Sequence, residues 1–256
     1  MTDNKTITIT ANVDGVSAPA LRAIRTAVEI VWVALPALGN ADFNQLNNEG
    51  ADLSLKFEPP EDNAEKRQNY QAWLLGKAFQ ELANGARASL EQAYIYCKAM
   101  KLKGTKGTLS ELQEMLMTNE HRASRMNFPD LLDAIEGEIG GSLNFRPELL
   151  SLQKTRNCLE HRAGFVGLID CAPGEKELKL DLPHLKMAVQ IDGREVDMKP
   201  GLRVEKGGEI IIRLAKRTRT FALGQRITFQ GDEFAEIAHA LQFFVSELVE
   251  RLIKLG

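Results

Sequence analysis

Apolar side chains recur at helical spacing along most of the chain. The longest such pattern spans residues 64–100, where one predicted helix face carries Leu75, Phe79, Leu82, Ala86, Leu90, Ala93 and Cys97. Gly76 and Gly85 interrupt this pattern, and each costs about 1 kcal/mol relative to alanine inside a helix. The sequence therefore predicts one long helix, with a kink or a break allowed at the two glycines.

Capping residues mark the limits of two other predicted helices. Ser17 is suited to be an N-cap with Pro19 in the first turn, and Pro36 and Gly39 are expected to end that helix. Thr108 opens another helix, because a glutamate three positions later completes a capping box.

Three later helices complete the helical pattern. Pro129 begins one that ends at the glycines of positions 140 and 141, and Pro147 begins the next, which Gly164 ends. A last helix starts near residue 233. Its predicted inward face carries Phe234, Ile237, Leu241, Phe244, Leu248 and Leu252.

Alternating apolar and polar positions predict strands in two parts of the chain. Thr6–Val13 is the first, and after a polar loop over 40–51 a short strand is expected at Leu53–Phe57. Asp192 and Gly193 favour a hairpin between two later runs. These later runs cover residues 165–170, 178–182, 187–191, 210–214 and 226–229. They predict a small antiparallel sheet.

Together these elements predict an α+β protein that is mainly α. A helical body covers about residues 17–164, and a C-terminal helix covers about 233–255. The β-rich segment, about 165–231, is inserted before that last helix. Because no obvious flexible linker separates two parts, we expect a single domain over residues 1–256.

Composition and charge narrow the classes of function. Of the 256 residues, 44% are hydrophobic and 26% are charged, which argues against global disorder. The net charge of -3 argues against broad electrostatic coating of nucleic acid or membrane, although a local basic patch is compatible with it. The cysteines are too few and too scattered for a zinc site or a disulfide framework. We therefore expect reduced thiols and no metal or other cofactor.

The amino terminus and the apolar runs favour a cytoplasmic location. Residues 1–5 are polar and no apolar core follows them, so no secretory signal is expected. The longest apolar run, Ile30–Leu38, contains a proline and is far too short to span a bilayer. We therefore expect a cytoplasmic protein with no membrane partner.

The segment Arg156–His161 is the main candidate site. It places an arginine, an asparagine and a histidine at short spacing near the end of a predicted helix. RNA cleavage by its own 2′-OH needs a base, an acid and a cation for the charge that grows on the phosphate, and it requires no metal. His161 can exchange protons near neutral pH, and Arg156 can bind phosphate through paired N–H groups. Asn157 can orient the imidazole or donate to the phosphate.

Helical geometry indicates that one copy of this motif is half of a site. Each residue turns about 100°, so Arg156 shares a face with Glu160, and Asn157 shares the neighbouring face with His161. Arg156 and His161 lie about 140° apart and about 7.5 Å apart along the axis. Two copies of the helix that meet across a two-fold axis would bring both sets to one cleft.

With these residues the chain resembles the HEPN domains, an all-helical superfamily with a motif of arginine, a polar residue and a later histidine. In catalytic members this motif forms a metal-independent endoribonuclease site at a homodimer interface. The resemblance implies that Arg156 binds phosphate, that Asn157 is its polar partner and that His161 is the acid–base group. It also implies a homodimer, an RNA substrate, a defence, toxin or RNA-processing role, and an antitoxin or other regulatory protein as partner. The β-rich segment departs from the family's compact helical core.

Simpler interpretations of the same residues stay open. Arg156 and Glu160 also have the spacing of an ordinary ion pair on a helix surface. His161 also suits the carboxyl end of a helix, where a cation interacts with the dipole. A non-catalytic HEPN-like module that binds nucleic acid, a nucleotide or a protein is therefore an alternative to the nuclease, and so is a purely structural module.

A basic run in the β-rich segment is a second, weaker candidate for substrate binding. It comprises Lys216, Arg217 and Arg219, between two predicted strands. Such a cluster can contact the phosphate backbone of RNA. It is more often a solvated hairpin, and the sequence leaves both interpretations open.

Overall fold

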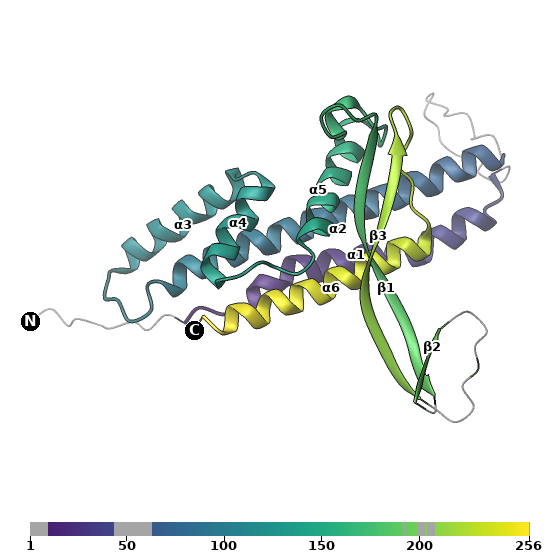
Figure 1. Ribbon diagram of the computed structural model, residues 1–256. Helices are drawn as coiled ribbons and strands as arrows, with labels where there is room; N and C mark the ends of the chain where they lie inside the picture. The colour runs from purple at the N-terminus through teal and green to yellow at the C-terminus, as the bar shows by residue number, and fades with distance from the viewer. Residues whose placement is uncertain (1–9, 44–62, 192, 199–202, 204–207, 256) are drawn as a thin grey trace, which may run out of the picture.

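Six α-helices and one three-stranded sheet make up the part of the chain that the computed structural model describes (Figure 1). This part covers residues 10–43, 63–191, 193–198, 203 and 208–255. The mainly helical content and the antiparallel sheet confirm the predicted α+β class. No helix in these ranges is long and apolar enough to cross a membrane. The elements are α1 (Asp14–Asn40), α2 (Ala64–Met100), α3 (Leu109–Arg125), α4 (Phe128–Ile139), α5 (Arg146–His161), β1 (Glu177–Ile191), β2 (Arg194–Asp197), β3 (Glu209–Ala222) and α6 (Gly231–Ile253).

The longest helix, α2, lies against all five other helices. It runs without a break through both glycines that interrupt its apolar pattern. A β-carbon on Gly85 would lie 2.4 Å from the Ala23 side chain of α1. A β-carbon on Gly76 would lie 3.3 Å from Leu159 of α5. The two glycines are therefore points where neighbouring helices approach closely, and neither breaks the helix.

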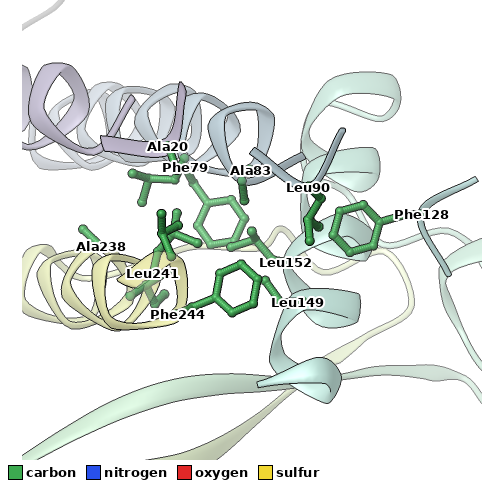
Figure 2. Close-up of a cluster of buried hydrophobic side chains, with 14 of the residues drawn as sticks. Ala20, Phe79, Ala83, Leu90, Phe128, Leu149, Leu152, Ala238, Leu241 and Phe244 are labelled. Carbon is green, nitrogen blue, oxygen red and sulfur yellow. The ribbon is translucent and has the colours of Figure 1, made fainter. Parts of the chain in front are cut away.

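Apolar side chains from the helices and the sheet form one core. All seven residues of the predicted face of α2 are buried, and so are the six predicted inward residues of α6. Figure 2 shows Phe79 of α2 and Phe244 of α6 pointing into the space between these helices. Leu149 and Leu152 of α5 reach the same space. The ring of Phe79 also stacks on Phe229, with centroids 4.7 Å apart.

Helix α1 begins earlier and ends later than the sequence predicts. It starts at residue 14, so Ser17 lies inside the helix and is not its N-cap, and it continues past Pro36. Pro19 also lies inside the helix, and the next residue, Ala20, donates its N–H to the buried hydroxyl of Ser89 on α2 at 3.0 Å. A tertiary contact thus supports the helix at a proline that would weaken it in isolation.

Arg67 of α2 explains why α1 continues to residue 40. Its Nη1 donates to the carbonyl oxygens of Leu38 and Gly39, at 2.9 and 3.0 Å. Its Nη2 donates to the carbonyl of Ala41 at 2.6 Å. Carbonyls at a helix end lack partners within the helix, so this guanidinium stabilises the last turn. The predicted stop at Pro36 was wrong because the sequence pattern does not include this contact, whereas Gly39 lies one residue before the observed end.

The β-rich segment is dominated by one long ribbon of two strands. β1 and β3 pair antiparallel from Glu177 with Ala222 to Gln190 with Glu209. The short β2 pairs with the end of β1, which gives the strand order β2-β1-β3. Gly193, in the turn between β1 and β2, has a φ of 77°, as the predicted hairpin requires. Figure 1 shows one end of the ribbon beside α5 and the other end extending beyond the helices.

Two of the five predicted strand runs are not strands. Residues 165–170 form a turn that ends in the short 3₁₀ helix Leu168–Asp170, and residues 226–229 are irregular. One isolated bridge joins Phe165 to Arg226. Val166 and Phe229 are each buried in the core. The alternating apolar positions in these two runs therefore mark buried side chains, although the backbone there does not form a strand.

The predicted start of α3 and the predicted end of α4 agree with the structure. Thr108 and Glu111 form the expected capping box of α3, and Gly140 ends α4 in the left-handed conformation. Most of the strand predicted at Thr6–Val13 lies outside the described residues, and its described part, 10–13, is not a strand. The strand predicted at Leu53–Phe57 lies wholly outside them.

We predict that Gly85→Ala destabilises the fold, although alanine is the better helix former. The added methyl group would meet Ala23 at 2.4 Å, and overpacking of this kind costs about 1–3 kcal/mol. Urea unfolding followed by circular dichroism measures the free energy of unfolding. The matched control is Gly137→Ala in α4, where nothing lies within 4 Å of the added atom; it should gain up to about 1 kcal/mol. Equal stability of the two variants would contradict the close contact.

Candidate functional site

Ion pairs and hydrogen bonds fix helix α5, which carries the motif. At its start, Arg146 pairs with Asp133 and Glu136 of α4, at 2.5 and 2.6 Å. One turn later, the buried hydroxyl of Ser151 accepts the backbone N–H of Asp181 in β1 at 2.9 Å. These contacts hold α5 to α4 and β1, and the helix also packs against α2.

The motif side chains lie on the partly exposed side of the last turns of α5. Arg156 pairs with Glu160, with 2.6 Å between Nη2 and Oε2, and its Nη1 donates to Oδ1 of Asn157 at 3.3 Å. The same oxygen of Glu160 lies 3.9 Å from Nε2 of His161. The His161 side chain is 60% exposed and that of Arg156 is 26% exposed. The structure thus brings the cation and the imidazole to one carboxylate at the surface.

The Glu160 carboxylate shows where an anion can contact both the guanidinium of Arg156 and the imidazole of His161. A phosphate oxygen in the position of this carboxylate would accept a hydrogen bond from Arg156 and lie close to His161. An exposed pair of this i,i+4 kind contributes only about 0.3–0.5 kcal/mol, so an incoming phosphate can displace the carboxylate. One chain presents a single imidazole here, whereas cleavage through the 2′-OH uses both a base and an acid.

The turn that follows α5 is held by one nearly buried ion pair. Arg162 donates from Nε to Oδ2 of Asp170 at 2.7 Å and from Nη2 to Oδ1. The backbone N–H of Gly167 donates to Oδ2 as well, at 2.9 Å, and only 5% of the Asp170 side chain is exposed. Burial acts against the charge of Arg162, but the hydrogen bonds to Asp170 outweigh it and raise the pKa of the guanidinium. The guanidinium therefore stays charged, and its hydrogen bonds to Asp170 hold the turn.

Cys158, inside the motif, is a packing residue. Burial, followed by the negative charge of Asp170, raises the pKa of its thiol to about 11. Its Sγ donates to the carbonyl of Phe165 at 3.3 Å. A thiol in this state is a poor nucleophile at neutral pH, so Cys158 adds no reactive group to the site.

The basic run lies inside strand β3 and not between two strands, so it is not the solvated hairpin that the sequence left open as an alternative. Arg219 binds both oxygens of Glu233 on α6, at 2.5 and 2.6 Å, and Arg217 donates to Glu236 at 2.7 Å. Lys216 lies on the other face of the ribbon and pairs with a carboxylate of β1 at 3.3 Å. Two of the three cations thus join the ribbon to α6. Among the described residues, no hydrogen bond or ion pair connects this run to the motif.

Comparisons with models of known families, with curated proteins and with solved structures give no match. Within the described ranges, no group of three or more His, Cys, Asp or Glu side chains could hold a metal ion. The functional assignment therefore depends on the geometry of α5 and on its sequence motif.

The apolar alternation does not indicate the residues that shape the end of this site. It predicts a strand at residues 165–170, and in a strand Asp170 would not return to Arg162. One feature of the sequence is consistent with the pair, because no other charged residue lies between Arg162 and Asp170. The pattern also gives no sign that Leu168 and Ile169 are 69% and 83% exposed.

We predict that Asp170→Asn loosens the turn and lowers the free energy of unfolding by about 1–3 kcal/mol, because Arg162 loses its charged partner in a mostly buried place. Denaturant unfolding measures the loss. The matched control is Asp133→Asn, whose carboxylate is 63% exposed and whose partner keeps a second glutamate. It should change stability by less than about 0.5 kcal/mol. Equal effects of the two substitutions would show that Asp170 does not hold the turn.

Proposed function

We propose that the chain is a metal-independent endoribonuclease that cleaves RNA phosphodiesters through attack of the 2′-OH, at a site formed across a homodimer. The observation that supports this most is the convergence of Arg156 and His161 on the carboxylate of Glu160, on the exposed side of α5. A cation beside a solvent-facing imidazole is suited to acid–base cleavage of a phosphodiester. The resemblance of the motif to that of HEPN domains supports the same assignment.

In this proposal two chains supply the two proton-transfer groups. One His161 takes the proton of the 2′-OH, and the freed oxygen attacks phosphorus. The His161 of the second chain gives a proton to the 5′-oxygen as its bond to phosphorus breaks. The products are a 2′,3′-cyclic phosphate and a 5′-hydroxyl. Arg156 binds the non-bridging oxygens and stabilises the charge that grows on them, while Asn157 holds the guanidinium.

A non-catalytic binding module is the second candidate, and one observation favours it. In the single chain, Glu160 already neutralises Arg156, as it would on an ordinary helix surface. The two arginines of β3 are likewise paired with glutamates of α6. A module of this kind would use Arg156 to bind a nucleotide, nucleic acid or protein without turnover. A purely structural helix would show the same ion pair.

We place the proposed activity in the cytoplasm, in a defence, toxin or RNA-processing role. Three free thiols suit a reducing compartment. An antitoxin or another regulatory protein is the partner that the resemblance suggests. Co-purification of the untagged endogenous chain would identify such a partner.

We predict that the purified protein cleaves total RNA in the presence of EDTA and that His161→Ala reduces the rate by at least about 100-fold, because the variant lacks the acid–base group. Gel analysis of RNA over time measures the rate. The matched control is His121→Ala, an exposed histidine of α3, which should leave cleavage unchanged. Intact RNA with the wild-type protein, or cleavage that survives His161→Ala, would contradict the nuclease.

We also predict that Glu160→Gln strengthens RNA binding about three- to tenfold at low salt. The substitution frees Arg156 from its carboxylate and removes a negative charge from the place that the phosphate takes. Fluorescence anisotropy with a labelled single-stranded RNA measures the affinity. Glu247→Gln, which breaks the corresponding i,i+4 pair with Arg251 on α6, is the control and should have no effect. Unchanged or weaker binding by Glu160→Gln would show that the carboxylate does not compete with RNA.

A further inference from the structure

A hollow lies where the start of α5, the ribbon and α6 meet, and we call it the α5–α6 hollow. It has a volume of about 590 Å³. Its walls include Phe145 and Glu148 at the start of α5, Leu214 and Lys216 of β3, and Phe243 and Glu247 of α6. A smaller apolar recess shares Phe145 and Glu148 with it and reaches the core residue Phe244, which Figure 2 labels. Hollows of roughly 300–1,000 Å³ with apolar walls and a few polar groups are the usual form of a small-molecule site.

The charged side chains of the hollow differ in whether they have partners. Lys216 pairs with Asp181 at 3.3 Å, and Glu247 pairs with Arg251 at 2.6 Å. Within the described part of the chain, no hydrogen bond or ion pair engages the half-buried carboxylate of Glu148. A carboxylate that is partly removed from water without a partner is unfavourable, and a bound cation would relieve this. The hollow is therefore suited to a positively charged ligand.

Aromatic rings from two elements supply a second feature that suits a cation. Phe145 and Phe243 both line the hollow, and Phe243 is 43% exposed although its side chain is large and apolar. The face of an aromatic ring attracts an ammonium group through the quadrupole of the ring. Leu214, which is 40% exposed, extends the apolar wall along β3. These walls are suited to a ligand with an apolar body and one positive end.

Phe145 is held in a backbone conformation that large residues rarely adopt. Its φ of 65° and ψ of 13° lie in the left-handed region. The next residue, Arg146, pairs with Asp133 and Glu136 of α4, and the Leu149 N–H donates to the Phe145 carbonyl at 2.8 Å. Strained residues that are fixed by surrounding contacts are concentrated at ligand sites. Here the fixed residue carries the ring that lines both the hollow and the recess.

We propose that the α5–α6 hollow binds a small amphipathic amine. Its ammonium group pairs with the carboxylate of Glu148, and its apolar body lies against the rings of Phe145 and Phe243. The site is separate from the motif, because Glu148 precedes Arg156 by eight residues, which is about 12 Å along α5. The proposal therefore does not depend on the proposed ribonuclease, and either can fail without the other.

The test compares three probes of similar size by isothermal titration calorimetry: phenylbutylamine, phenylbutyrate and the neutral phenylbutanol. Wild-type protein is expected to bind the amine at least about tenfold more tightly than phenylbutyrate, since only the amine can pair with Glu148. Glu148→Gln is expected to weaken amine binding at least about tenfold and to change phenylbutanol binding by less than about twofold. Glu114→Gln, which removes an exposed carboxylate from α3, is the matched control and should bind the amine as the wild type does.

Phe243→Ala tests the apolar wall in the same assay. It is expected to weaken phenylbutylamine and phenylbutanol alike, at least about fivefold, because both lose the same apolar contact. The Phe243 side chain is partly exposed, so the variant should keep the fold, which circular dichroism checks. No binding of the amine by wild-type protein at millimolar concentration would overturn the proposal. So would equal or tighter binding of phenylbutyrate, or amine binding that either Glu148→Gln or Phe243→Ala leaves unchanged.

Discussion

Neighbouring helices approach α2 closely at two glycines, and this close packing organises the helical body. At Gly85 a β-carbon would lie 2.4 Å from the Ala23 side chain of α1, and at Gly76 it would lie 3.3 Å from the side chain of Leu159. Leu159 lies within the motif, between Arg156 and His161. The glycine at position 76 therefore lets α5 pack closely on α2 at the turn that carries the motif.

The ribbon is joined to this helical body by two kinds of contact. Leu178, Leu180 and Leu182 of β1 are buried against the core, where their apolar area is removed from water. Beside them, Arg217 and Arg219 reach glutamates of α6, among them Glu233, whose side chain is only 9% exposed. The basic run thus has a structural role that is visible in one chain. The motif differs in this respect, because its histidine faces solvent and serves no packing purpose.

Sequence patterns predicted the helices well and the contacts between them poorly. The apolar faces of α2 and α6 were correct because helical periodicity is a local property. Helix propensity marks Gly76 and Gly85 as weak points because it does not reveal a neighbouring helix. It marks Pro36 as a stop because it does not include the contact with Arg67, which is far away in sequence. The pair of Arg156 with Glu160, which the sequence leaves open as an ordinary helix-surface ion pair, is confirmed, and the functional role of the motif stays a prediction. The 3₁₀ turn at Leu168–Asp170 was not predicted, since alternation over 165–170 suggests a strand.

If one chain carries half of the proposed ribonuclease site, activity depends on association of two chains. We would measure the specific activity of the wild-type protein, in EDTA, over a wide range of protein concentrations, with the fraction of dimer determined at each. We expect activity per chain to be low in dilute solution, to rise with the fraction of dimer and to level off when all chains are paired. Activity per chain that stays constant across that range, or no cleavage even when every chain is paired, would contradict it.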